Sequence, residues 1–228
     1  MELWHVLNRG VEGRDLFLDP QDYARFVHNL YEFNDAQPAD NLARLFDSSG
    51  MRDFVNPSFR GTRELLVEIH GWVLMRNHYH LLLSELVEGG ISLFMRKLNT
   101  GYANYFNVRY ARIGTLFQGR TKKVLIERQA HFLYILHYLH LNPLDYLKGA
   151  EGWRQRDKGR VPNIREALAH LDGYRWGSYL DYAGKKNFPS ILTKNRFEDR
   201  SGEYVRNLRD YLRNAEEPGE DFANLWLE

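Results

Sequence analysis

Two apolar runs follow each other almost without a break in the first half of the chain. ELLVEIHGWVLMRN covers residues 64–77, and HYHLLLSEL covers residues 78–86. Each run has the apolar content of a strand, and the junction MRNH is short enough for a tight turn. The pair predicts an antiparallel β-hairpin, which any fold of this chain has to contain.

The remaining apolar patterns predict strands and helices on both sides of this hairpin. Asp19 is a candidate N-cap for the first helix, and Pro20 suits its first position. Strands are expected over 3–10 and 115–127, and helices over 19–34, 92–110, 128–142 and 203–214. Up to residue 142 the order is β-α-β-β-α-β-α. This order predicts an α+β fold, with a ferredoxin-like antiparallel sheet and helices packed on it.

The chain is expected to divide into a main domain and a C-terminal extension. Residues 1–147 form the predicted domain, which a long polar loop over 35–63 interrupts. Residues 148–228 form the predicted extension. Its aromatic stretch over 173–186 is expected to pack back on the domain, and an acidic tail begins at residue 216.

Composition excludes several classes of protein. Hydrophobic residues make up 43% of the chain, which indicates a packed core and argues against disorder. No apolar run approaches eighteen residues, so no membrane-spanning helix is expected. The N-terminus MELWHVLNRG does not resemble a signal peptide, and a cytoplasmic protein is expected. The absence of cysteine excludes disulfides, thiolate nucleophiles and cysteine-ligated zinc.

Charge is distributed unevenly along the chain. Residues 91–160 contain thirteen Lys or Arg and four Asp or Glu, so this segment carries +9 while the whole chain carries +1. The rest of the chain therefore carries −8. Such a basic segment favours a surface that binds a polyanion, and the alternative is a chance imbalance on a solvated surface.

Two histidines stand two residues apart at the start of the second predicted strand. Side chains in a strand alternate between faces, so His78 and His80 are expected to point to the same face. Their Cα atoms would be roughly 6.6 Å apart, which allows both imidazoles to bind one metal ion. The alternative is a pair of partly buried, hydrogen-bonded histidines.

Three polar residues follow one face of the helix predicted over 128–142. Tyr134, Tyr138 and Asn142 are spaced four residues apart, and Pro143 ends the helix. A metal site needs more than two ligands, and this face offers further candidates, whereas the alternative is ordinary core packing of a tyrosine stripe.

In combination, these motifs resemble the HUH single-tyrosine transposases, and most closely the REP-associated tyrosine transposases. The resemblance rests on HGWVLMRNHYHLLLSE, followed about sixty residues later by HYLHLNP. WHVLNRGVEGRDLFLDPQDYARF, GYANYFNVRYARIGTLFQGR and YRWGSYLDYAG agree with it. It covers residues 3–147 well and 173–184 loosely, and it implies that residues 1–147 are an HUH-type catalytic domain.

The resemblance implies a role for each matching residue. His78 and His80 match the pair that binds a divalent metal, and Asn142 matches the third, polar ligand. Tyr138 matches the nucleophile, four residues before the Asn of NP. Tyr79, between the histidines, is a mild departure from the aliphatic residues that are common there. Mg²⁺ or Mn²⁺ is the expected cofactor, although zinc also accepts these ligand types.

The family's substrate is single-stranded DNA next to imperfect hairpins, and the same partner is expected here. The basic segment and its aromatic residues supply candidates for phosphate contact and base stacking. The candidate DNA-binding residues are Arg120, Lys122, Lys123, Tyr105, Arg109 and Arg112. Either a monomer or a homodimer fits the resemblance, and no membrane partner is expected.

Three functions are compatible with the sequence. The first is metal-dependent nicking and strand transfer of single-stranded DNA through a covalent 5′-phosphotyrosine, at hairpin-flanked sites. The second is a non-catalytic nucleic-acid-binding protein on the same fold. The third is a metal-dependent phosphoesterase that uses water as its nucleophile. Only the first predicts a covalent protein–DNA adduct.

Overall fold

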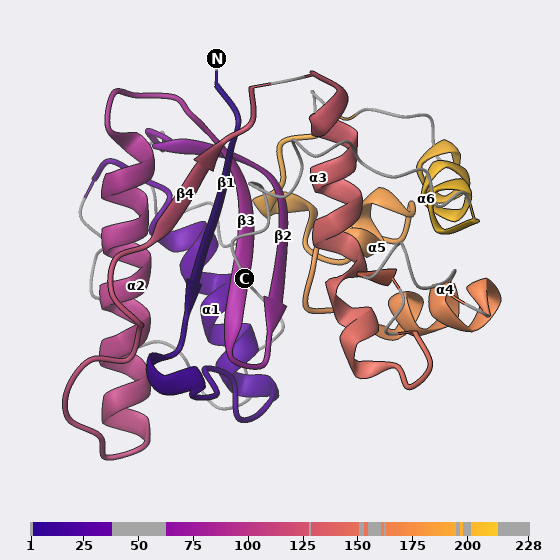
Figure 1. Ribbon diagram of the computed structural model, residues 1–228. Helices are drawn as coiled ribbons and strands as arrows, with labels where there is room; N and C mark the ends of the chain where they lie inside the picture. The colour runs from indigo at the N-terminus through magenta and orange to yellow at the C-terminus, as the bar shows by residue number, and fades with distance from the viewer. Residues whose placement is uncertain are drawn as a thin grey trace.

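The three-dimensional structure is a computed structural model of the chain (Figure 1). It describes residues 2–37, 63–127, 129–150, 153–154, 161, 163–194, 197 and 202–213, and for 129–133 it describes the backbone alone. Most of the predicted 35–63 loop and the whole acidic tail from residue 216 lie outside the described residues.

A four-stranded antiparallel sheet forms the centre of the molecule. Its strands are β1 (Trp4–Arg9), β2 (Val67–Met75), β3 (His78–Glu85) and β4 (Lys122–Leu125). They lie in the order β2-β3-β1-β4, and every neighbouring pair is antiparallel. This arrangement confirms the predicted ferredoxin-like sheet and the hairpin between β2 and β3.

Two helices cover one face of the sheet and a third lies on the other. Figure 1 shows α2 (Gly90–Arg109) and α3 (Gln129–Leu141) on opposite sides of the strands, with α1 (Pro20–Glu32) on the same side as α2. Asp19 caps α1 as predicted, because its carboxylate accepts hydrogen bonds from the backbone N–H groups of Gln21 and Asp22.

The period-two alternation of the strands supplies each face with its own buried core. On the α1/α2 face, Val6, Tyr79 and Leu81 pack with apolar residues of those helices. On the α3 face, Val73 and Leu82 pack against the helix. Because side chains alternate between the two faces, His78, His80 and Leu82 of β3 point toward α3, while Tyr79 and Leu81 point toward α1 and α2.

Glycine allows α3 to lie close to the sheet. A Cβ atom at Gly71 of β2 would lie 2.9 Å from Leu136 Cδ1 and 3.6 Å from Leu139 Cδ2. Real Cβ atoms essentially never approach a neighbour as closely as 2.9 Å, so a larger residue at position 71 would require the Leu136 side chain to shift. The close approach brings the α3 side chains onto the face that carries His78 and His80.

Four C-terminal elements pack around α3. They are the short turn η4 (Asn142–Tyr146) and the helices α4 (Ile164–Gly173), α5 (Tyr179–Tyr182) and α6 (Glu203–Arg213). The turn η6 (Pro189–Ile191) instead contacts α1, and Ile191 belongs to the core on the α1/α2 face. Residues of α4, α5 and α6 share one apolar cluster with α3. The 173–186 stretch packs back as predicted, while the boundary at residue 147 stays a prediction.

Three elements differ from expectation. The strand predicted over 115–127 is regular only in β4, because Gly119 takes a left-handed backbone (φ +69°) and the segment before it pairs through a single bridge between Phe117 and Gly10. The helices α4 and α5 were not predicted. In the described part of the chain, no helix is both long and apolar enough to cross a membrane.

Candidate active site

Three histidines gather on the α3 face of the sheet. His78 and His80 lie at the start of β3, and their ring centroids are 5.0 Å apart at an interplanar angle of 85°. His5 of the neighbouring strand β1 stacks on His80, with centroids 5.1 Å apart and planes 16° apart. The two histidines that the sequence placed on one face therefore have a third beside them.

Hydrogen bonds orient two of these rings. His80 Nδ1 is 2.9 Å from His5 Nε2, and His78 Nδ1 is 2.7 Å from Asn77 Oδ1. These bonds fix each ring through Nδ1. Both ligand candidates thus keep Nε2 as the nitrogen on the far side of the ring, which is the arrangement in which histidines commonly bind metal ions.

Tyr138 of α3 faces this histidine cluster. Its ring centroid lies 5.8 Å from that of His80 and 6.1 Å from that of His5, and both contacts are edge-on. Tyr134, one turn earlier, contacts Tyr211 of α6 at 5.6 Å. The structure thus brings Tyr138 to the histidines and gives Tyr134 a packing contact with the C-terminal helix.

An arginine holds the tyrosine and the asparagine that sequence analysis selected. Arg154 donates from Nη1 to Tyr138 Oη at 3.1 Å and from Nη2 to Asn142 Oδ1 at 2.8 Å. It also forms a salt bridge with Asp145, the shortest N···O distance being 2.7 Å. The Asn142 amide donates to the Tyr138 carbonyl oxygen at 2.8 Å. Both Tyr138 and Asn142 are buried, and the Trp153 ring contacts the Tyr138 ring with centroids 5.8 Å apart.

The metal-binding potential of this site rests on the histidine pair. His78 and His80 have the ligand type and spacing for one divalent ion. The Asn142 oxygen already accepts a bond from Arg154, so coordination by Asn142 would have to share that oxygen or displace the arginine. Within the described ranges, no group of three or more His, Asp or Glu side chains is arranged to hold a metal ion. Asn142 as third ligand stays a prediction.

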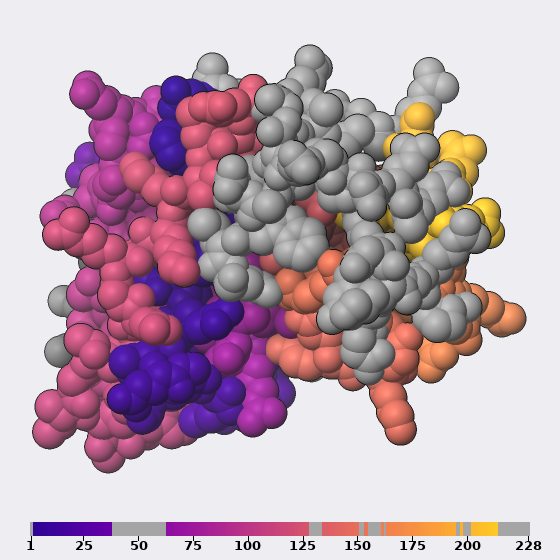
Figure 2. All heavy atoms as spheres, in the orientation of Figure 1, coloured from indigo at the N-terminus to yellow at the C-terminus, as the bar shows by residue number. Residues whose placement is uncertain are grey.

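The predicted phosphate-contacting residues on and before β4 lie at the surface. Arg120, Lys122 and Lys123 are exposed, and the Lys123 ammonium lies 4.9 Å from the centroid of the Trp4 ring. Lys122 stands opposite Leu7, which in turn pairs with His80 across the sheet. Figure 2 shows the N-terminal segment (indigo) bordered on the surface by the segment around β4 (pink).

The other predicted DNA-binding residues make contacts within the protein. Arg109 bonds to the carboxylates of Asp19 and Asp22, and Tyr105 donates to Asp22 Oδ1 at 3.0 Å. Burial raises the pKa of Tyr105 to about 12, so its hydroxyl stays neutral at physiological pH. DNA contact by these residues stays a prediction.

Arg112 has a comparable internal role. It donates to Asn107 Oδ1 at 2.8 Å and to the carbonyl oxygen of Thr115 at 3.2 Å. These bonds brace the turn after α2, and a contact between Arg112 and DNA also stays a prediction.

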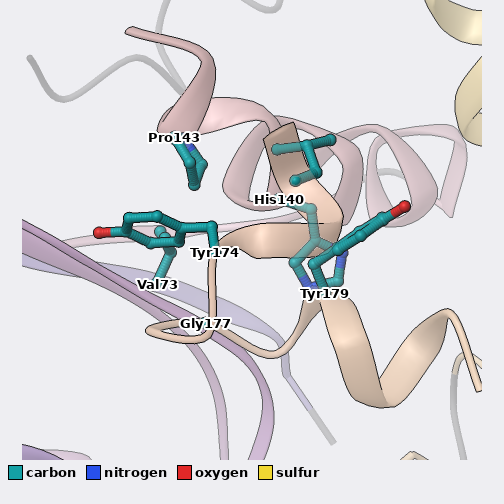
Figure 3. A pocket seen from close by; sticks show the side chains of 7 residues that line it. Val73, His140, Pro143, Tyr174, Gly177 and Tyr179 are labelled. Atoms are coloured by element: carbon teal, nitrogen blue, oxygen red, sulfur yellow. The ribbon is translucent and has the colours of Figure 1, made fainter. Parts of the chain in front are cut away.

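A fourth histidine of interest, His140, points away from the cluster into the C-terminal core. It lies between Tyr204 Oη at 2.5 Å and Ser178 Oγ at 2.7 Å. Figure 3 shows it beside Tyr179 in a small pocket that Tyr174 and Pro143 also line. Burial lowers the pKa of His140 well below its ordinary value, with a smaller effect of His137. This histidine is therefore neutral and structural.

Sequence reasoning missed two residues of this site. His5 joins it because β1 pairs with β3, a pairing that local periodicity does not reveal. Arg154 joins it from a polar stretch without helical or strand pattern. The one available signal for His5 was its position in the predicted strand 3–10, two residues before Leu7, which places both on one face.

Comparison with known proteins gives a relationship at the level of the fold. No family model matches the sequence, and no curated protein matches it. Among solved structures, the chain is similar to a REP-associated tyrosine transposase bound to a REP hairpin, with a TM-score of 0.50 and 13% sequence identity. The similarity covers 88% of this chain and 90% of that chain. At this level of identity the match shows a shared fold.

Proposed function

We propose that this protein nicks and rejoins single-stranded DNA at hairpin-flanked sites, with Tyr138 as the nucleophile and a covalent 5′-phosphotyrosine as the intermediate. One observation carries the proposal: the Tyr138 ring lies 5.8 Å from the ring of His80, and His78 lies beside His80 on the same face of β3, with ring centroids 5.0 Å apart. The solved structure with the similar fold is that of a transposase bound to a REP hairpin, which supports a nucleic-acid partner.

The chemistry of the proposed step is a substitution at phosphorus. The Tyr138 oxygen loses its proton and forms a bond to phosphorus, while the bond between phosphorus and the 3′-oxygen breaks. The 3′-oxygen takes up a proton and leaves as a free hydroxyl, and the 5′ side stays attached to Tyr138. Attack by the 3′-hydroxyl of another strand reverses the step and joins that strand to the 5′ side.

The residues around Tyr138 have distinct proposed roles. His78 and His80 would hold a divalent ion, Mg²⁺ or Mn²⁺, with Asn142 as the proposed third ligand; when bound, the ion supplies positive charge for the scissile phosphate. His5 keeps His80 in a fixed orientation. Because Tyr138 is only 2% exposed, side chains around it have to shift before a DNA phosphate can reach its hydroxyl.

The runner-up is a non-catalytic nucleic-acid-binding protein on the same fold. A purely binding surface gains nothing from a tyrosine buried against two oriented histidines, because nucleic acid is bound mainly by exposed cationic and aromatic side chains. The grouping of Tyr138 with His5 and His80 therefore favours the enzyme.

Adduct trapping tests the proposal. Single-stranded DNA from the flanks of the gene, including its hairpins, is incubated with the protein and Mg²⁺ or Mn²⁺ and analysed on a denaturing gel. The enzyme gives a labelled protein band that protease removes, together with a released strand that a polymerase can extend. Binding without any adduct would favour the non-catalytic alternative, and cleavage without an adduct would favour hydrolysis by water.

A further inference from the structure

We propose that Arg9 binds the scissile phosphate beside the histidine pair, which makes it a substrate-contacting residue of the reaction. This inference rests on the proposed function for the identity of the phosphate. It does not depend on which metal ion is used, because Arg9 supplies its own positive charge.

Strand pairing places Arg9 at the histidine site. In the antiparallel register of β1 and β3, Arg9 stands directly opposite His78, and Leu7 stands opposite His80. Side chains that oppose each other in an antiparallel pair point to the same face, with Cβ atoms about 4.5–5.5 Å apart. The Arg9 side chain therefore leaves the sheet on the face that carries His78, His80 and Tyr138.

The backbone around Arg9 is held on both sides. The Arg9 carbonyl oxygen accepts a bond from Gln118 N–H at 2.8 Å, and Gly10 N–H donates to the Asn77 carbonyl oxygen at 2.8 Å. Gly10 is required here, because a Cβ atom at this position would collide with the carbonyl oxygen of Arg14. Arg9 thus projects from a fixed point next to Asn77, the residue that orients His78.

Arg9 differs in its charge balance from the other arginines near the site. Arg76 pairs with Asp15 at 2.8 Å, and Arg154 pairs with Asp145. Arg9 is a partly buried residue, and its guanidinium forms neither a salt bridge nor a hydrogen bond within the described ranges. A guanidinium with no anionic partner has its donors available for an incoming anion.

A phosphodiester is an anion that can pair with the Arg9 guanidinium. Its two non-bridging oxygens match the forked N–H donors of a guanidinium, which binds phosphate in a bidentate manner. Negative charge accumulates on these oxygens as the Tyr138 oxygen attacks, so a fixed cation at their side lowers the barrier of the step. Arg154 is less suited to this role, because Asp145 already balances its charge.

The test compares Arg9→Gln with Arg76→Gln, which removes the same charge two residues from His78 but from a side chain that is 68% exposed and paired. The first probe is a short labelled oligothymidylate, bound in EDTA across a range of salt. Arg9→Gln should weaken binding roughly tenfold and flatten the log–log salt slope by about 0.7, the share of one phosphate contact. Arg76→Gln should bind as the wild type does.

The second probe is the hairpin-bearing strand used for adduct trapping. Arg9→Gln should slow adduct formation more than tenfold, and Arg9→Lys should restore the salt slope but only part of the rate, because an ammonium lacks the bidentate fork. Melting curves show whether each variant is folded.

The outcomes separate this inference from the proposed function. Equal adduct rates for wild type and Arg9→Gln overturn the inference and leave the proposed function intact. If the wild type forms no adduct but its binding of oligothymidylate still depends on Arg9, the proposed function is overturned. Arg9 then remains a phosphate-binding residue. Binding that Arg9→Gln does not change, or no binding by the wild type, overturns the inference.

Discussion

Replacing Tyr138 by phenylalanine removes one oxygen atom from the site. The hydroxyl accepts a 3.1 Å hydrogen bond from Arg154, and the ring contacts His80 and His5. The phenylalanine ring retains the ring contacts. Arg154 retains its bonds to Asn142 Oδ1 and to Asp145, so the network around the helix end survives.

The expected cost in stability is small. One hydrogen bond to a charged donor contributes about 1.5–3 kcal/mol when both groups are shielded from water, and a neutral one about 1 kcal/mol. The Arg154 side chain is 20% exposed, so water can replace part of the lost bond, and we expect about 1 kcal/mol. For a chain of 228 residues this corresponds to a fall in melting temperature of about 2–4 °C.

The expected cost in activity is complete loss of the adduct. No other oxygen replaces the nucleophile at this position, and loss of a covalent nucleophile typically lowers the rate by a factor of about 10⁴ or more. The matched control is Tyr134→Phe, because Tyr134 lies one turn away and contacts Tyr211. It should form the adduct at a rate near that of the wild type.

Peptide mass spectrometry of the trapped adduct decides between the two tyrosines. We expect the modification on the peptide that contains Tyr138, at that residue. An adduct in Tyr138→Phe at the wild-type rate, or a modified Tyr134, would refute the assignment. If Tyr138→Phe cuts DNA normally and the wild type carries no adduct, water is the nucleophile.

Three further outcomes are expected. Replacing both His78 and His80 with alanine should abolish metal-dependent cleavage while oligonucleotide binding persists; normal cleavage would contradict the metal assignment. Single strands with a hairpin should bind better than blunt duplex, with a salt slope of about −0.7 per phosphate contact, as measured by fluorescence anisotropy; equal affinity for duplex would point to another substrate. Burial lowers the pKa of His140, so the unfolded chain takes up a proton below about pH 6.5 that the folded protein does not. The free energy of unfolding, measured with urea, should therefore be constant above about pH 6.5 and decrease below that pH, by up to about 1.4 kcal/mol per pH unit. His140→Gln should lack this part of the decline, and an unchanged decline would show that other groups cause it.

The sequence correctly predicted those helices and strands that have a clear hydrophobic periodicity or capping signal. The hairpin 64–86 became β2 and β3, and the capping signal at Asp19 became the start of α1. Both features depend on residues close in sequence, where side-chain alternation and capping operate. The strand over 115–127 was predicted too long, because Gly119 allows a left-handed turn that ends regular pairing.

The face shared by His78 and His80 was also predictable, since it follows from the strand period alone. The position of His5 was not, because it depends on the register in which β1 pairs with β3. The choice of Tyr138 over Tyr134 rested on its spacing to Asn142 and on the YxxxNP position of the family that the sequence resembles, and it stays a prediction. One tyrosine meets the histidines, and the other meets α6.

The roles of the arginines depend on tertiary structure more than any other feature. In the sequence, Arg109 stands in the basic segment and Arg9 does not, so charge counting favours Arg109 for DNA binding. Folding reverses this ranking, because Asp19 and Asp22 reach Arg109 from about ninety residues away and balance its charge. Arg9 has no anionic partner in the part of the chain that the structure describes, and it stands opposite His78. A cation binds an external phosphate well when folding has not already supplied an anion, and only the folded chain shows which arginines meet that condition.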